Sequence, residues 1–416
     1  MAVSPQGKRA GLSLLAELTG KDLESGQSSQ ALMIAPKNII ICCDGTSNEF
    51  GRVNTNVVRL FQSLDLTPAA AQVAYYDPGV GTLAAPGAWT RLGRVLSRAF
   101  GLAFGAGIFT NIEQAVSFLM QQYSPGDRIF IFGFSRGAYT ARAIAGLLHK
   151  CGLPQAGADN LMPYLRRIFR NTSEWDVSRA FKQTFCRPCP VSFLGLWDTV
   201  STIGWVYNPQ HLPYTRTNPE VGCVRHAVAL DERRCFYRTN LWGKPPPDAQ
   251  GPEQDVKEVW FAGVHSDVGG GYPPAESMLW KCSFAWMVQE AAAAGVKFNA
   301  QGVEHFLGAV SPVNPWSSTE AHQSLHGFWW ACECLPKKYW DDHAVPPCYR
   351  YRIPMGGPRQ VPPGAQLHRS IIDRMRTRAV YRPPNLDPGF VSRIVASPPV
   401  TETVSYTPDP PPKPPG

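Results

Sequence analysis

The sequence predicts an α/β fold with a mainly parallel sheet, helices on both faces of the sheet and lid-like insertions. Apolar runs of strand length alternate with segments whose apolar residues recur at helical spacing, which is the pattern of parallel β-α units. Polar residues follow directly where the apolar runs end. In open parallel sheets the ligand site lies at this end of the strands, so the polar residues there are the candidate functional residues.

Five apolar runs are predicted as strands and five segments as helices. The runs are short, continuous and rich in β-branched and aromatic residues, as expected for strands covered on both faces. The predicted strands are residues 37–43, 72–77, 127–132, 190–197 and 257–264. The predicted helices are residues 54–64, 97–123, 138–148, 161–170 and 278–294.

The chain of 416 residues is long enough for one large α/β domain with insertions. Leu212 and Trp242 are among the apolar residues suited to a lid, and they lie in segments rich in Pro, Gly, Asn and Trp. We expect a flexible leader (1–36), an α/β domain (37–300) with insertions near 152–188, 203–222 and 240–256, a C-terminal extension packed on it (301–397), and an extended, disordered proline-rich tail (398–416).

Composition indicates which classes of partner the protein can bind and in which cellular compartment it is expected. The net charge is +8, but the basic residues form no long block interleaved with aromatics, so we expect no nucleic-acid partner. A mild positive charge favours contact with anionic membranes. No apolar run approaches the ~20 residues that span a bilayer, and the N-terminus lacks a signal-peptide core, which predicts a cytoplasmic protein.

The eleven cysteines suggest neither a disulfide framework nor a strong metal site. They are odd in number and scattered, and we expect mostly reduced thiols. Cys186 and Cys189 have zinc-type spacing, but Cys332 and Cys334, which would complete four ligands, are separated by one residue only. We therefore expect no metal and no other cofactor.

Residues 133–137, Gly-Phe-Ser-Arg-Gly, form a G-x-S-x-G motif between a predicted strand and a predicted helix. This is the context of a nucleophile elbow, a turn that exposes a serine hydroxyl above the end of a sheet. The two glycines suit a turn too tight for a Cβ at the flanking positions. The motif marks Ser135 as a candidate nucleophile, against the simpler interpretation of a glycine-rich turn.

A serine hydroxyl needs a base to take its proton and a third group to orient that base. Asp198 and His265 each follow a later predicted strand, so both would reach the same edge of the sheet as Ser135. Serine, then acid, then histidine is the chain order of α/β hydrolases. We therefore predict a catalytic triad of Ser135, Asp198 and His265 on an α/β-hydrolase-like fold.

Other residues compete for two of these roles. The alternative bases are His226 and His368, and the alternative acids are Asp231, which we expect on a later helix, Glu232 and Asp267. Asp267 lies only two residues from His265. We therefore expect Asp267 to brace the loop, in preference to acting as the acid or binding a cation.

An oxyanion hole needs two N–H donors aimed at the developing negative charge. The N–H of Arg136, the residue after the nucleophile, is expected to be one of them. The second is expected from the loop after the first strand, where Gly45 and Thr46 are the best donors and Asp44 would hold the turn. An ordinary turn stabilised by the Asp44 side chain explains the same residues equally well.

Several motifs occur together in one order along the chain. They are residues 43–48 with 54–56, and then 79–82, 133–138, 197–200, 226–233 and 263–272. Together they resemble the α/β-hydrolase domain of type VI secretion phospholipase effectors over roughly residues 37–300, with a weaker similarity at 367–374. The resemblance implies a triad on Ser135, Asp198 and His265 that hydrolyses phospholipid acyl esters.

The resemblance also implies partners and a route of export. An effector of this family would meet an immunity protein and secretion machinery, and export by a specialised secretion system is the alternative to a cytoplasmic location. At the ends of the chain the sequence departs from the family, since we recognise neither a membrane-binding module nor a delivery domain.

Three functions are consistent with the sequence. The leading hypothesis is a serine esterase that cleaves lipid esters, most plausibly a phospholipase. A soluble carboxylesterase or thioesterase is the alternative within enzymes. A non-catalytic interaction scaffold that uses the Trp-rich C-terminal part is the alternative from another class.

Overall fold

A computed structural model describes most of the chain, and the described residues belong to one compact unit, residues 36–416. The predicted leader therefore lies almost wholly outside the described residues, as do parts of the predicted lid-like insertions. The described residues are 35–45, 51, 53–79, 104–171, 173–200, 204–205, 208–209, 212–243, 254–273, 275–308, 316, 319–341 and 348–409.

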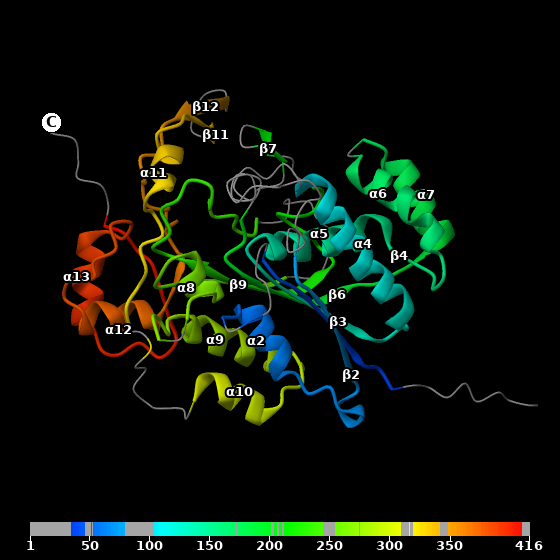
Figure 1. The fold of residues 1–416 in the computed structure, drawn as a ribbon, viewed down its shortest axis with the longest axis horizontal. Helices are drawn as coiled ribbons and strands as arrows, with labels where there is room; N and C mark the ends of the chain where they lie inside the picture. Colours follow the sequence, from blue (N-terminus) through cyan, green and yellow to red (C-terminus); the bar gives the residue numbers. More distant parts are fainter. Residues whose placement is uncertain are drawn as a thin grey trace, which may run out of the picture. The chain divides into compact units, whose positions relative to one another are not determined.

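An eight-stranded sheet forms the centre of this unit (Figure 1). In spatial order its strands are β14 (Thr403–Ser405), β13 (Gln366–His368), β10 (Asp255–Phe261), β9 (Val221–Ala229), β6 (Val191–Trp197), β3 (Arg128–Phe134), β1 (Asn38–Cys43) and β2 (Gln72–Asp77). All neighbours are parallel except β13 and β14. The predicted mainly parallel sheet is therefore confirmed.

Helices cover both faces of the sheet because each central strand is apolar on both sides. Ile39 and Ile41 pack into one buried cluster, and Ile40 and Cys42, which point the opposite way, pack into another. The first cluster includes residues of α4 (Phe104–Gln122), α5 (Arg136–Cys151) and α6 (Met162–Arg170), and the second includes residues of α2 (Asn56–Ser63) and α9 (Trp280–Ala293). The predicted layered α/β fold is thus observed.

The C-terminal residues complete the far end of the sheet. Strands β13 and β14 extend it, and α12 (Arg369–Thr377) and α13 (Pro388–Ala396) bury a third apolar cluster against β9 and β10. The prediction of a disordered tail from residue 398 is wrong for residues 398–409. There Thr403–Ser405 pairs with β13, and the buried Tyr406 packs edge-on against Phe390.

Two further expectations need correction. The segment before Asp231 is strand β9, not a helix. Two of its polar side chains are buried with acidic partners: Arg225 forms an ion pair with Glu290, and His226 is hydrogen-bonded to Glu258. Leu212 and Trp242, which were expected to belong to a lid, are buried in the core between sheet and helices.

The remaining described elements are short. They are the 3₁₀ turns η1 (Pro68–Ala70) and η2 (Asp159–Leu161), the helices α7 (Trp175–Phe185), α8 (His265–Gly269), α10 (Ala300–Leu307) and α11 (Phe328–Glu333), and the antiparallel pairs β4 (Leu153–Pro154) with β5 (Cys186–Arg187), β7 (Gly204–Trp205) with β8 (Asn208–Pro209), and β11 (Lys337–Asp341) with β12 (Cys348–Arg352). No helix within these described ranges has both the length and the apolar character required to cross a bilayer.

The order of the strands reverses at β1, and their carboxyl ends meet there. From β1 the chain crosses to β2 on one side, and β3 then lies on the other side of β1. A reversal of this kind is where open α/β sheets bind ligands. Cys43, the last residue of β1, pairs with Gly133 of β3, so β1 ends beside the part of β3 that leads into Ser135.

Candidate active site

Ser135 lies in a strained turn between β3 and α5. Its φ is 59° and its ψ is −120°, a left-handed conformation that costs a residue with a Cβ roughly 1–3 kcal/mol. The Ser135 N–H donates to the carbonyl of Trp197 at 3.0 Å, which ties the turn to the end of β6. These features are those of a nucleophile elbow.

The two glycines of the motif are required by space. A Cβ at Gly133 would lie 2.5 Å from the carbonyl oxygen of Gly137, across the turn. A Cβ at Gly137 would lie 2.2 Å from the carbonyl oxygen of Cys43 and 2.4 Å from that of Asp44. Only glycine therefore allows α5 to begin directly against the end of β1.

The structure brings together the three residues predicted from the strand ends. His265 Nε2 lies 2.8 Å from Ser135 Oγ, and His265 Nδ1 lies 2.6 Å from Asp198 Oδ2. His265 opens α8 after β10, and Asp198 follows β6. All three residues are buried: Ser135 is 8% exposed, His265 4% and Asp198 1%. Their hydrogen bonds therefore lie in surroundings that exclude most water.

Asp198 is held by more than the histidine. Its Oδ1 accepts hydrogen bonds from the Ala229 N–H at 2.9 Å and from Arg359 Nη1 at 2.6 Å, and its Oδ2 accepts one from Arg359 Nη2 at 2.9 Å. Burial alone would raise the pKa of Asp198, but the Arg359 guanidinium and His265 outweigh it, so the pKa lies well below its ordinary value. Asp198 is therefore an anion at any physiological pH.

Arg359 was not among the residues predicted from the sequence. It comes from the C-terminal region, and its guanidinium also donates to the carbonyls of Ala229 at 2.8 Å and Tyr237 at 2.5 Å. It ends no apolar strand and belongs to no motif, and it lies 161 positions from Asp198 in the chain. No local signal in the sequence points to this pair.

The surroundings of His265 favour its neutral form. Burial is the main cause that lowers its pKa, and the hydrogen bond that its Nδ1–H donates to Asp198 opposes this only in part. Phe134 stacks on the imidazole at 4.6 Å between ring centroids, and Tyr237 meets it edge-on at 4.7 Å. The backbone N–H of His265 donates to Glu232 at 3.2 Å. The imidazole is thus fixed in place and uncharged near neutral pH.

The predicted oxyanion donors are described in part. Arg136 is the first residue of α5, so its N–H lies at the positive end of the helix dipole. The Gly45 N–H donates to Asp44 Oδ1 at 2.6 Å, while Thr55 and Tyr76 donate to Asp44 Oδ2 at 2.8 Å each. Asp44 therefore holds this turn. Thr46 lies outside the described residues.

The alternative bases are engaged elsewhere. His226 Nδ1 lies 2.8 Å from Glu258 Oε1, and its Nε2 accepts the N–H of Thr199 at 3.2 Å. His368 caps α12 by accepting the Ser370 N–H, and burial lowers its pKa to about 3. Both imidazoles serve as structural hydrogen-bonding groups.

The alternative acids also have structural partners. Asp231 accepts hydrogen bonds from the Gly263 N–H at 2.6 Å and the Tyr381 hydroxyl at 2.8 Å, and burial raises its pKa to about 6. Glu232 is buried and forms an ion pair with Arg234 at 2.9 Å. Burial would raise the pKa of Glu232, but its bonds with Arg234 prevail and set it at about 2.

Asp267 braces the loop that carries His265. Its Oδ2 accepts the N–H groups of Val264 and His322, each at 3.1 Å, and its Oδ1 lies 2.8 Å from His322 Nδ1. The His322 imidazole stacks on Tyr272 at 3.4 Å between centroids. Across the part of the chain that the structure describes, no three His, Cys, Asp or Glu side chains are grouped as metal ligands.

Comparison with known proteins gives one family. Residues 37–290 match the family described as T6SS, Phospholipase effector Tle1-like, catalytic domain. The uncharacterized protein YEL023C of Saccharomyces cerevisiae is 34% identical over 238 residues, which cover 53% of this chain and 34% of that protein. The chain thus spans about a third of the length of this curated relative.

Two solved structures also match. One is the crystal structure of an uncharacterized protein from Pseudomonas aeruginosa, with 20% identity, a TM-score of 0.42, and coverage of 66% of this chain and 49% of that chain. The other is the Tle1 effector bound to the VgrG spike from the type 6 secretion system, with 21% identity, a TM-score of 0.33, and coverage of 59% of this chain and 53% of that chain.

Proposed function

Since this chain belongs to the family of Tle1-like phospholipase effector catalytic domains, we propose that it is a serine hydrolase that cleaves the carboxylic esters of lipids. The observation that carries the proposal is the pair of hydrogen bonds that connects Ser135 through His265 to Asp198. A neutral histidine between a strained serine and a buried carboxylate is the arrangement that activates a serine.

The proposed reaction has two halves. His265 Nε2 takes the proton of Ser135 Oγ while the oxygen attacks the ester carbonyl, and the carbonyl oxygen becomes an oxyanion near the start of α5. When this intermediate collapses, the bond to the alcohol breaks, and the imidazolium gives its proton to the leaving alcohol. His265 then takes a proton from water, and the water oxygen attacks the acyl carbonyl. When this second intermediate collapses, the bond to Ser135 Oγ breaks, the imidazolium returns its proton to Oγ, and the fatty acid is released. Asp198 stabilises the imidazolium in both halves and stays ionised.

We propose a phospholipid as the substrate because the family is one of phospholipase effectors. The ring of Tyr237 beside His265 supports this choice, since it continues into an aromatic cluster with Trp329 at 5.8 Å, and Phe236 lies 6.1 Å from Trp329. These rings would offer aromatic surface to an acyl chain, whose transfer from water is favourable by about 0.8 kcal/mol per buried CH₂ group, and Arg234, over the Tyr237 ring at 3.7 Å, adds a positive charge beside them.

Family membership also leads us to propose an immunity protein and a type VI secretion spike as partners. The solved Tle1 effector is bound to VgrG, and the matched family is defined by such effectors. Co-purification of this chain with a VgrG spike protein tests the second partner. Complete separation of the two proteins on a sizing column at micromolar concentration would reject it.

A fluorophosphonate probe tests the activated serine, because the probe labels a serine only when a base has made it nucleophilic. We expect rapid labelling of the wild type and none of Ser135→Ala. Folded Ser135→Ala, verified by circular dichroism, serves as the control. Absence of labelling in folded wild-type protein, or equal labelling of the variant, would reject the proposed function.

A further inference from the structure

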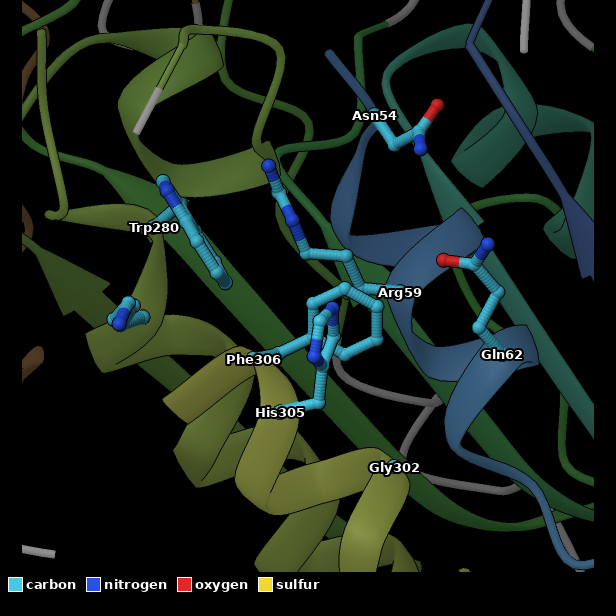
Figure 2. Close-up of a pocket in the computed structure, with 8 residues that line it drawn as sticks. Asn54, Arg59, Gln62, Trp280, Gly302, His305 and Phe306 are labelled. Carbon is cyan, nitrogen blue, oxygen red and sulfur yellow. The ribbon is translucent and has the colours of Figure 1, made fainter. Parts of the chain in front are cut away.

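A cavity of about 570 Å³ lies between α2, α9 and α10, on the face of the sheet covered by these helices (Figure 2). Its lining includes two cations, two amides and two aromatic rings, namely Arg59, Lys281, Asn54, Gln62, Trp280 and Phe306. None of its lining residues is acidic, and none belongs to the proposed triad.

Arg59 is a buried cation in this cavity. It is 4% exposed, and its guanidinium lies over the Trp280 ring at 3.6 Å. Its Nη1 donates to Asn56 Oδ1 at 3.1 Å, but among the described residues no carboxylate forms an ion pair with it. Burial lowers the pKa of Arg59 to about 10, and the more distant charge of Asp44 opposes this only in part.

Lys281 adds a second positive charge at the same cavity. Its ammonium donates to the carbonyl of Leu307 at 3.3 Å, and in the described part of the chain it has no acidic partner. Burial, and then the charge of Arg59, lower the pKa of Lys281. Two cations that share a partly enclosed space repel each other unless an anion lies between them.

Packing holds the Arg59 side chain in one position at the cavity. The Arg59 side chain is held by Trp280 and Asn56, and a Cβ at Gly270 would lie 2.5 Å from its Nη1, so the backbone packs closely there as well. Figure 2 shows Arg59 extending from α2 beside Phe306 of α10 toward Trp280, with Gln62 on the other side of Arg59. A side chain that is already held by its neighbours loses less conformational freedom when it binds a ligand than a mobile one.

We propose that this cavity binds the phosphate group of a phosphate ester. A tetrahedral phosphate offers more acceptor oxygens than a carboxylate, and the cavity lining holds donors of two kinds, the cations Arg59 and Lys281 and the amides of Asn54 and Gln62. The volume exceeds that of phosphate alone, and the Trp280 and Phe306 rings provide apolar surface for an organic part. The phosphate belongs either to a soluble ester or to a lipid headgroup.

Calorimetric titration of the full chain with inorganic phosphate and with glycerol 3-phosphate tests the soluble source. Flotation with phosphatidylcholine vesicles, with and without phosphatidic acid, tests the lipid source. We expect Lys281→Gln to weaken binding roughly ten- to hundredfold, the effect of losing a charge-assisted hydrogen bond. Arg59→Gln should weaken binding to a similar extent. Because Arg59 is buried, this variant can fail to fold, and the partly exposed Lys281 then supplies the test. Arg179→Gln, at an exposed position on α7, is the matched control.

Each result decides the proposal. Binding of the soluble phosphates that is lost in Lys281→Gln and kept in Arg179→Gln supports a soluble ester. Binding only to vesicles with phosphatidic acid, with the same dependence on Lys281, supports a lipid headgroup. Absence of binding to both probes, or equal binding by Lys281→Gln and the wild type, overturns the proposal. Labelling of Ser135 by the fluorophosphonate is independent of all three outcomes.

Discussion

The carboxylate of Asp198 accepts hydrogen bonds from two side chains at once, the neutral imidazole of His265 and the guanidinium of Arg359. Its Oδ2 bonds His265, and both of its oxygens bond Arg359. Because the guanidinium neutralises part of the negative charge, Asp198 stabilises an imidazolium less than an isolated carboxylate would. Burial is the main cause that keeps His265 a weaker base than an exposed histidine, and a positive charge on Arg359 acts in the same direction.

We therefore predict a change in pH dependence for Arg359→Gln. The wild type should lose kcat/KM as pH falls through the lowered pKa of His265, since a protonated imidazole cannot accept the serine proton. Without the guanidinium, the full charge of Asp198 should raise that pKa, so the acidic limb should move to higher pH. Arg359→Lys should restore much of the wild-type profile. An unmoved acidic limb in Arg359→Gln, or one at lower pH, would contradict this role.

The acid of the triad can be tested in the same way. Asp198→Asn should keep the fold but present an amide to His265, and turnover should fall by roughly 10³–10⁴-fold. Asp231→Asn is the control, because Asp231 bonds Gly263 and Tyr381 instead. Steady-state turnover of a lipid ester measures both. Near-normal turnover in Asp198→Asn combined with loss in Asp231→Asn would assign the acid to Asp231.

The two buried histidines should differ sharply. His265→Ala should lower turnover by about a thousandfold or more, because triad members act as a unit. His226→Ala removes an imidazole that bonds Glu258 and Thr199, so it should reduce stability and leave turnover per folded molecule within about tenfold. Dividing turnover by the concentration of folded protein, measured for each variant, allows the two variants to be compared. A reversed order of the two effects would place the reactive centre elsewhere.

Local sequence explains which of these residues could be foreseen. Ser135, Asp198 and His265 each follow an apolar strand, and parallel strands end at one edge, so their meeting followed from the pattern. Arg359 could not be foreseen in this way. Its contact with Asp198 depends on how a segment without regular structure, 161 positions away, folds back over the sheet.

At the scale of elements, the start of α5 packs directly against the end of β1. Gly137→Ala would place a Cβ 2.2 Å from the Cys43 carbonyl oxygen, so helix and strand must separate. We predict a loss of about 1–3 kcal/mol in the free energy of unfolding, measured by denaturant titration. Gly222→Ala is the control, because its Cβ would lie 3.2 Å from the nearest atom. Equal stability of the two variants would show that the junction yields easily.

Elements differed in how well they could be predicted. Strands β1 and β3 are continuous apolar runs, and such runs identify buried parallel strands. Strand β9 was missed because Arg225 and His226 interrupt the apolar pattern, and only their burial with Glu290 and Glu258 makes them compatible with a central strand. Strand β14 has three residues beside a proline-rich segment, too few to produce a periodic signal.

For the whole molecule, charge and exposed apolar residues bear on how it meets lipid. The net charge is +8, which attracts the protein to anionic surfaces. Tyr351, Ile353 and Met355 are 65%, 52% and 58% exposed at alternate positions in and after β12, and Arg359 follows four residues after Met355. The segment that bonds Asp198 thus also presents apolar side chains to solvent.

We predict faster hydrolysis of anionic phospholipid vesicles than of a short soluble ester, with an advantage that shrinks as salt rises. Exposed charges are screened beyond about 10 Å at 0.1 M salt, so attraction to the bilayer should weaken while chemistry at the buried Ser135 should not. Mass spectrometry of the products measures the reaction, and fatty acid with lysophospholipid is the expected pair.

Two surface variants separate membrane contact from chemistry. Ile353→Ser should slow vesicle hydrolysis severalfold and leave soluble-ester hydrolysis unchanged, because it removes an apolar side chain that would enter the lipid surface. Val380→Ser is the matched control, since Val380 is 91% exposed and lies outside this segment. Rapid cleavage of the soluble ester without any vesicle product would instead identify a carboxylesterase. An equal response of both variants would show that the segment after β12 does not contact the bilayer.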